Sequence, residues 1–138
     1  MKFHSTKFRV YYEDTDAGGI VYHSNYLKFA ERGRCEMLRD FGHECSKFEE
    51  ETGLMYVMKF AELEYNQPAY LDDLLEVRTM VQSMRNSSFQ MRQLVYRDNE
   101  ELCNMLLTLV CVDAKTIKPV RLPDFLRKQF EPYMIMEE

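Results

Sequence analysis

The chain has 138 residues, of which 46% are hydrophobic and 30% charged, and its formal net charge is −5 at pH 7. This length fits one domain spanning residues 1–138, and the apolar content offsets the entropy of ordering the chain, which excludes a disordered protein. The negative charge and the lack of clustered Lys and Arg argue against a nucleic-acid partner, because affinity for phosphate chains depends on basic clusters that displace counterions. A compact phosphorylated ligand needs only a few local basic side chains and remains compatible with this charge.

The sequence also indicates a compartment. The N-terminal run MKFHSTKFRVYYED lacks the apolar core of a signal peptide. No stretch approaches the ~20 apolar residues that span a bilayer. The four cysteines contain no CxxC pair and are typical of reduced core residues. We therefore expect a cytoplasmic protein with no transmembrane segment and no disulfide framework.

The first predicted strand covers residues 7–13, KFRVYYE, where β-branched and aromatic side chains precede a turn-forming stretch at residues 14–19. A long helix is predicted over residues 25–41, because apolar side chains recur there near helical spacing. Ser24 or Asn25 is the expected N-cap, and Gly42 is the expected residue just after the helix.

Four further strands are predicted after a polar stretch at residues 46–52, and they cover residues 55–65, 74–84, 88–97 and 102–113. Turn-type residues separate these strands, as expected between antiparallel neighbours, and a short helix follows over residues 122–130. The last strand is apolar on both alternating faces, so we expect it to be covered on both sides, either centrally in the sheet or by a partner subunit. The order predicts an α+β fold with one antiparallel sheet on one helix, and its uncovered apolar surface predicts oligomerisation.

Reactive side chains are densest in YYEDTDAGGIVYHSNY, residues 11–26, on the predicted loop between the first strand and the long helix. Asp14 and Asp16 flank a threonine, two glycines allow close backbone approach to a ligand, and His23 lies beside the helix start. The N–H groups at a helix start lack intrahelical partners and stabilise an oxyanion formed from a carbonyl. A carboxylate aimed at that carbonyl, either attacking it or activating water, completes a hydrolytic site.

Composition alone favours a purely structural interpretation of this loop over a chemical one. Asp and Thr before a helix commonly close turns or cap the helix, paired glycines often form a turn, and a single histidine is usually a structural residue. The co-occurrence of two carboxylates, two glycines, a histidine and several tyrosines at one helix entrance favours chemistry.

Other kinds of site match the sequence poorly. The DTD triplet lacks the further oxygen ligands that a divalent metal needs, and His4, His23 and His43 have no zinc-ligand spacing. The glycine pair matches neither the phosphate loop nor the dinucleotide fingerprint, and no serine lies in a nucleophile-elbow context. We therefore expect no metal and no cofactor, and a serine hydrolase is disfavoured.

The run RVYYEDTDAGGIVYHSNYLKFAERGR resembles the 4-hydroxybenzoyl-CoA thioesterase branch of the hotdog superfamily, and most closely its YbgC group, which is associated with the Tol–Pal cell-envelope system of Gram-negative bacteria. The resemblance continues through EYNQPAYLDDLLEV and SMRNSSF to LVCVDAKTIKPVRLP, so it covers nearly the whole chain. It implies the hotdog fold, in which a five-stranded antiparallel sheet wraps around one long central helix. It also implies hydrolysis of acyl-coenzyme A thioesters, with coenzyme A as part of the substrate.

The resemblance implies roles for individual residues of the loop. The second Asp of the motif is the family's catalytic carboxylate and matches Asp16, while His23 matches the position where a backbone N–H polarises the thioester carbonyl. In the YbgC group the histidine side chain and a tyrosine matching Tyr12 are also implicated in activity. Gly19 and Tyr22 belong to the same motif and are expected to contact the substrate.

Basic residues for coenzyme A are fewer here than in the family. The aromatic-acid thioesterases place a basic cluster after the third strand, where this chain offers Arg85, followed by Asn86 and Ser87. Arg85 and Ser87 are therefore the expected contacts, with Lys118 and Arg121 as further candidates for the phosphates.

Two helix residues, Glu31 and Arg34, also match the family pattern, and we interpret them as a structural ion pair. The depth of the acyl pocket is expected to depend on how side chains such as Met55, Tyr56 and Phe60 pack across subunits. Because family members are typically tetramers built from dimers, we expect a homodimer that assembles to a homotetramer.

Two functions of different classes follow from these residues. The first is a thioesterase acting on acyl-coenzyme A or on acyl carrier protein thioesters, in which Asp16 either attacks the carbonyl or activates water. The second is a non-catalytic scaffold that binds acyl carriers or phospholipid-synthesis enzymes at the cell envelope. A hotdog dehydratase is disfavoured, because the Asp motif resembles that of the thioesterase branch.

Overall fold

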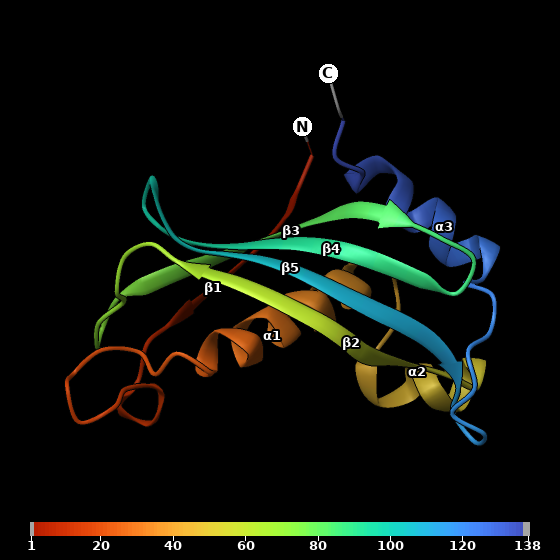
Figure 1. The fold of residues 1–138 in the computed structure, drawn as a ribbon, viewed down its shortest axis with the longest axis horizontal. Coiled ribbons are helices and arrows are strands. Elements are labelled where there is room, and N and C mark those ends of the chain that lie inside the picture. The colour runs from red at the N-terminus through yellow and green to blue at the C-terminus, as the bar shows by residue number, and fades with distance from the viewer. Residues whose placement is uncertain (1, 137–138) are drawn as a thin grey trace.

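The computed structural model describes residues 2–136 and contains one five-stranded antiparallel sheet in the order β1-β3-β4-β5-β2 (Figure 1). Within these residues, three α-helices and two short 3₁₀ helices accompany the sheet, and the longest helix is α1 (Asn25–Asp40). The other strands and α-helices are β1 (His4–Arg9), α2 (Cys45–Thr52), β2 (Leu54–Tyr65), β3 (Leu74–Met84), β4 (Ser88–Arg97), β5 (Glu100–Asp113) and α3 (Asp124–Phe130). The predicted α+β architecture, with one sheet on one long helix, is confirmed.

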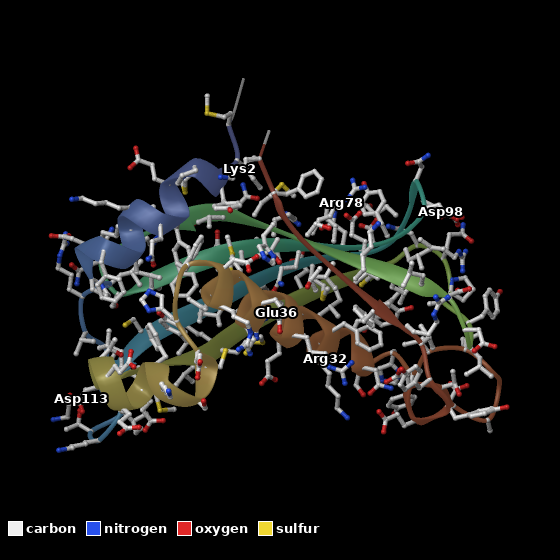
Figure 2. All side chains as sticks on the ribbon, turned by 180° about the vertical axis from the view of Figure 1, so that it is seen from behind. Lys2, Arg32, Glu36, Arg78, Asp98 and Asp113 are labelled. Carbon is white, nitrogen blue, oxygen red and sulfur yellow. The ribbon has the colours of Figure 1, made fainter. Side chains whose placement is uncertain are left out.

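The helix α1 lies across one face of the sheet, and Figure 2 shows it from the helix side with Arg32 and Glu36 along it. Its apolar side buries Phe29, Ala30 and Met37 in the same core as the alternating side chains of β3, β4 and β5. The helix ends in a Schellman arrangement, in which His43 N–H donates to the carbonyl of Leu38 over 2.9 Å and Gly42 has a φ of +96°. The predicted role of Gly42 is therefore confirmed.

One glycine inside α1 has a packing function. A Cβ placed on Gly33 would lie 2.7 Å from Cγ1 of Val77 on β3, so only glycine lets the helix approach the sheet this closely at that point. On the same side of the helix, the fully buried Gln93 of β4 donates to the carbonyl of Ala30 and to the hydroxyl of Thr79, each over 2.9 Å. Close approach and this polar bridge together fix α1 on the sheet.

Several predicted boundaries need correction. The first strand covers His4–Arg9 instead of residues 7–13, because the chain leaves the sheet after Val10 and the side chain of Asp14 accepts the Tyr11 N–H in a short 3₁₀ turn at Tyr12–Asp14. Most of the polar stretch after α1 forms the helix α2, which the polar composition concealed. The predicted side-chain N-cap is also wrong, because Ser24 has helical dihedral angles and makes no capping bond.

The two sides of the sheet and its two edges differ in exposure. On β5 the side chains facing α1, such as Met105 and Leu107, are fully buried, whereas the alternating side chains on the opposite face, such as Leu106 and Val110, are half-buried in the single chain. The edge strand β2 pairs with β5 and with no other strand of the described residues, and it exposes Val57, Phe60 and Tyr65 by between 37% and 52%. Among residues 2–136, no helix has the length and apolar character needed to cross a membrane.

Candidate active site

The DTD segment lies in the loop between β1 and α1, at one end of the sheet (Figure 1). Asp14 is buried and structural: its carboxylate accepts the Tyr11 N–H over 2.9 Å, and its carbonyl accepts both the Tyr22 N–H and the Asn25 side-chain amide. These bonds hold the beginning of the loop against the start of α1. The structural interpretation of an acidic residue before a helix therefore applies to Asp14.

Asp16 differs from Asp14 in its exposure and in its hydrogen bonding, the two properties that decide whether its carboxylate can react. It is exposed, its Oδ1 accepts the Gly18 N–H over 2.8 Å, and no residue in the described part of the chain donates to its Oδ2. Its backbone is fixed by bonds in both directions, since its N–H donates to the carbonyl of Ile20 and its carbonyl accepts from Gly19. One carboxylate oxygen is thus available at a position that the backbone holds in place.

Gly19 makes this turn feasible. Its φ is +82°, which lies in the left-handed region that favours glycine, and its N–H closes the turn on the carbonyl of Asp16 over 3.0 Å. The loop then returns to the sheet through an antiparallel bridge between Thr15 and Val21 and another between Ile20 and Tyr70. Gly19 therefore shapes the Asp16 turn, and its contact with the substrate stays a prediction.

A pocket of about 310 Å³ opens beside Asp16. It is lined from two directions: the loop and the start of α1 contribute one wall, and the end of β2 with the residues after it contributes the other. The lining residues are Asp16, Ile20, Val21, His23, Tyr26, Tyr65, Asn66, Gln67 and Pro68. Burial raises the pKa of Tyr26 to about 12, so this wall carries a neutral hydroxyl at physiological pH.

The entrance of α1 supplies a donor to the same pocket. His23 lies two residues before the first helical residue, and its backbone N–H has no hydrogen-bond partner among residues 2–136. The carbonyl of His23 accepts the Tyr65 hydroxyl over 2.8 Å, and its ring lies 4.3 Å from the ring of Tyr22. Because helix-entrance N–H groups carry partial positive charge, the pocket combines a free carboxylate oxygen with a donor suited to a carbonyl oxygen.

Neither Tyr12 nor Tyr22 is among the residues that line this pocket. Tyr12 is 81% exposed in the 3₁₀ turn, and Tyr22 is 44% exposed beside His23. In the single chain neither hydroxyl is directed into the Asp16 pocket by a described hydrogen bond. A role for either residue therefore stays a prediction.

The residues predicted to hold coenzyme A lie at the opposite end of the sheet, near α3 (Figure 1). Arg85 and Ser87 belong to the β3–β4 turn, which is bound to the start of α3 by the bond from Leu122 N–H to the carbonyl of Asn86. Lys118 follows β5 at the same end, and Arg121 pairs with Asp124 over 3.1 Å. One subunit alone does not bring these basic residues together with Asp16.

The predicted ion pair between Glu31 and Arg34 is wrong. No contact within 4.0 Å joins their charged groups, and the Arg34 guanidinium instead donates to the side chain of Gln93 over 3.0 Å. Burial lowers the pKa of Arg34 below its ordinary value, and the Glu31 carboxylate acts in the opposite direction. Arg34 is turned inward by the buried amide of Gln93, a partner on another strand that helical spacing does not reveal.

The contribution of β2 to the Asp16 pocket is not predictable from the sequence motif around Asp16. Tyr65, Asn66 and Gln67 form its second wall, although they lie 42 or more residues from His23 along the chain. The polar run EYNQP at the end of a predicted strand was the available signal. It indicated a turn, but not which loop that turn would face.

The geometry agrees with sequence relationships. The family model of the thioesterase-like superfamily matches residues 10–130. The chain belongs to this superfamily. It is 42% identical over 124 residues to the acyl-CoA thioester hydrolase YbgC of Escherichia coli, covering 89% of this chain and 92% of that protein. It is also 40% identical over 122 residues to the acyl-CoA thioesterase YbgC of Haemophilus influenzae, covering 88% and 90%.

Solved structures of thioesterases have the same fold. A probable thioesterase from Bartonella henselae superposes with a TM-score of 0.83 and 34% sequence identity, covering 88% of this chain and 100% of that chain. The resemblance to the YbgC group and the predicted hotdog fold are both confirmed. In this member of the thioesterase-like superfamily, the Asp16 pocket lies where the loop after β1 meets the N-terminal end of the hotdog helix.

Proposed function

We propose that this protein hydrolyses acyl-coenzyme A thioesters and that Asp16 is the catalytic carboxylate. One observation carries the proposal: in a single pocket, a carboxylate oxygen of Asp16 and the His23 N–H at the entrance of α1 both lack a hydrogen-bond partner within the described part of the chain. The names of the relatives, acyl-CoA thioester hydrolase and acyl-CoA thioesterase, support the same substrate class.

The pocket favours a reaction at the thioester carbonyl. The His23 N–H stabilises the oxyanion that forms on the carbonyl oxygen, while Asp16 either attacks the carbonyl carbon or removes a proton from an attacking water. Direct attack expels the coenzyme A thiolate and leaves a mixed anhydride, which water cleaves to the free acid and the Asp16 carboxylate. In the alternative, the water oxygen bonds to the carbonyl carbon, Asp16 takes the proton, and the thiolate leaves with a proton from Asp16.

The proposal includes a homodimer formed along β2. This strand is the longer of the two sheet edges, and its exposed Val57 and Phe60 are apolar. Such an edge is stabilised when a second copy pairs with it. A two-fold axis across β2 reverses the second sheet, so it brings the α3 end of one subunit to the Asp16 end of the other. Arg85 or Lys118 of the partner subunit then lies on the side from which the coenzyme A phosphates approach.

We further propose that two such dimers form a homotetramer. The face of the sheet opposite α1 has half-buried apolar side chains on neighbouring strands, including Leu94, Leu106 and Val110. A second dimer packed on this face would cover them, in agreement with the prediction that β5 is covered on both sides.

The remaining parts of the proposal rest on the YbgC resemblance. They are a cytoplasmic location, acyl carrier protein thioesters as an alternative substrate, and phospholipid-synthesis enzymes of the cell envelope as partners. The exposed Asp16 pocket is compatible with either carrier, because a flexible thiol arm can enter it from solvent.

A thiol-release assay with acyl-coenzyme A chains of increasing length tests the proposed activity. The protein as isolated is expected to release free thiol with saturation kinetics for a defined range of chain lengths. Binding of acyl-coenzyme A without release of thiol at any length would refute the thioesterase proposal and favour the non-catalytic scaffold. The same assay with acyl carrier protein thioesters decides between the two carriers.

A further inference from the structure

A second and larger cavity opens between α1, α2 and β2, and we call it the Arg34 pocket. It measures about 430 Å³ and is mainly apolar, with Leu38, Met58 and Leu109 among its lining residues. A small void of about 30 Å³ adjoins it and extends toward Phe89 and Phe130 in the core. The two spaces share Arg34, Leu38, Tyr56 and Leu109, so the pocket has an open mouth and a narrow inner end.

Polar groups without full partners lie at that inner end. The Tyr56 hydroxyl is buried and has no hydrogen-bond partner in the described part of the chain. The half-buried Arg34 donates one of its five N–H groups to Gln93 and none of the others to any residue between 2 and 136. A buried hydroxyl is normally satisfied, so the Tyr56 hydroxyl, with the Arg34 guanidinium beside it in the pocket lining, points to a ligand atom that accepts hydrogen bonds.

The charged side chains that line the pocket limit which kind of ligand oxygen can bind there. Two exposed carboxylates, Glu31 and Glu49, line the pocket together with the single guanidinium of Arg34. Their formal sum is negative, so a ligand carboxylate would meet net repulsion on entry. A neutral oxygen, such as a hydroxyl, accepts from Arg34 and Tyr56 without this cost.

The position of the Arg34 pocket along β2 indicates which catalytic site it serves. β2 contributes Leu54, Met55, Tyr56 and Met58 to the Arg34 pocket and Tyr65 to the Asp16 pocket. Tyr65 lies seven positions after Met58, which corresponds to roughly 23 Å at ~3.3 Å per residue. An acyl chain bound at Asp16 would have to cross that distance to reach the Arg34 pocket of its own subunit.

The distance is much shorter across the proposed dimer. Full antiparallel overlap of two copies of β2 places the two-fold axis near Lys59 and Phe60, so Leu54 lies opposite Tyr65 of the partner subunit. Paired strands are only about 4.8 Å apart. Tyr56 and Met58 point to the same face of the sheet as Tyr65, because all three pair with residues of β5 that are buried against α1.

We propose that the Arg34 pocket of one subunit receives the acyl group of the thioester that is bound at Asp16 of the partner subunit, and that Tyr56 and Arg34 select acyl groups with a neutral oxygen near their far end. This inference rests on the proposed thioesterase activity and assigns the substrate class of that site. Tyr56 and Arg34 are specificity-determining residues, since they contact the acyl group far from the reacting carbonyl.

The first test compares acyl-coenzyme A substrates of six, eight and ten carbons that end in a methyl, a hydroxyl or a carboxylate. At the length that the wild type hydrolyses fastest, kcat/KM should be highest for the hydroxyl and lowest for the carboxylate. Tyr56→Phe removes one oxygen and should lower the preference for hydroxyl over methyl by roughly 10-fold. Tyr96→Phe, on the opposite face of the sheet, is the matched control and should leave the preference unchanged.

The second test asks which subunit supplies the pocket. Asp16→Asn removes the carboxylate, and Met58→Trp fills the Arg34 pocket; Cys35→Trp, on the α1 wall, replaces Met58→Trp if that variant does not fold. Each homodimer should be nearly inactive. Chains co-expressed in equal amounts should recover about a quarter of the wild-type activity, because half the dimers are mixed and each mixed dimer has one complete site.

No recovery in the mixture would overturn the assignment across subunits. An unchanged preference in Tyr56→Phe, or a wild-type preference for the methyl or carboxylate chain, would overturn the selection by Tyr56 and Arg34. Absence of thiol release by the wild type with every substrate would instead refute the thioesterase proposal, and the pocket assignment with it. The two failures are therefore distinguishable.

Discussion

The hydroxyl of Tyr65 donates to the backbone carbonyl of His23 over 2.8 Å, and this bond ties the last residue of β2 to the entrance of α1. The Tyr65 ring also meets the ring of Tyr26 edge-on, with the centroids 5.4 Å apart. The donor proposed to polarise the thioester carbonyl is the N–H of the same His23. Its position consequently depends on a strand that lies at the free edge of the sheet.

Tyr65→Phe should therefore lower the turnover number without unfolding the protein. The ring and its contact with Tyr26 remain, but the carbonyl of His23 loses a neutral hydrogen bond that contributes roughly 1 kcal/mol. We expect kcat to fall by about 3-fold to 10-fold with little change in KM. Tyr70→Phe is the control, since Tyr70 is equally exposed and its hydroxyl makes no described hydrogen bond. Equal kcat values in the two variants would remove Tyr65 from the catalytic account.

Phe60→Glu should dissociate the proposed dimer. Phe60 is 52% exposed near the middle of β2, where a two-fold axis would bring the two introduced carboxylates close together. Size-exclusion chromatography with light scattering should show a lower mass for this variant than for the wild type, and thiol release should fall in parallel. Leu74→Glu introduces the same charge at an exposed position on β3 and should retain the wild-type mass. An unchanged mass for Phe60→Glu would contradict pairing along β2.

Gly33→Ala should destabilise the fold. The added methyl would lie 2.7 Å from Cγ1 of Val77, a distance that forces α1 away from β3. Overpacking of this kind costs about 1–3 kcal/mol, measurable as a lower midpoint of urea unfolding. Combining it with Val77→Ala removes the clashing atom, so the double variant should be less destabilised than the two single changes predict together. Simple additivity would show that the clash is relieved in another way.

Tyr56 should make the protein sensitive to alkali. Burial raises the pKa of its hydroxyl far above the ordinary value, so the unfolded chain releases the proton at a lower pH than the folded chain. The stability linked to this group is fully present below pH ~10 and is lost as the pH rises further, by about 1.4 kcal/mol per unit. The unfolding free energy of Tyr56→Phe, measured between pH 8 and 11, should therefore decline less steeply than that of the wild type. Parallel declines would mean that Tyr56 ionises equally easily in both states.

Local patterns predicted the fold well where one periodicity dominates. The apolar spacing of α1, the strand runs of β3 and β4, and the glycine after the helix at Gly42 all follow from interactions within a few residues. The end of β1 does not follow from local patterns. The Asp14 side chain closes a turn on the Tyr11 N–H, so the strand stops before the end of the β-rich run KFRVYYE. The helix α2 was missed because only Phe48 of its residues is buried, which leaves almost no apolar periodicity.

The residues of the candidate site also fall into two groups, those predicted from the local sequence and those that depend on distant contacts. Asp16 and His23 lie within one loop and were both predicted, whereas the wall formed by Tyr65 depends on pairing between distant strands. The predicted ion pair between Glu31 and Arg34 is wrong for a similar reason. Arg34 turns toward Gln93, which is 59 residues away along the chain. Contacts made across the sheet are decided by its register, and that register is not readable from spacing along the chain.

The kinetics of Asp16→Asn, with Asp14→Asn as its neighbour control, test the proposed catalytic role most directly. The Asn side chain at position 16 can still accept the Gly18 N–H, so the loop should keep its shape while the nucleophile or base is lost. In thiol release from acyl-coenzyme A, kcat should fall by roughly 100-fold or more with little change in unfolding free energy, while Asp14→Asn should retain most of its kcat. Undiminished kcat in folded Asp16→Asn would contradict the assignment of this carboxylate as the catalytic group.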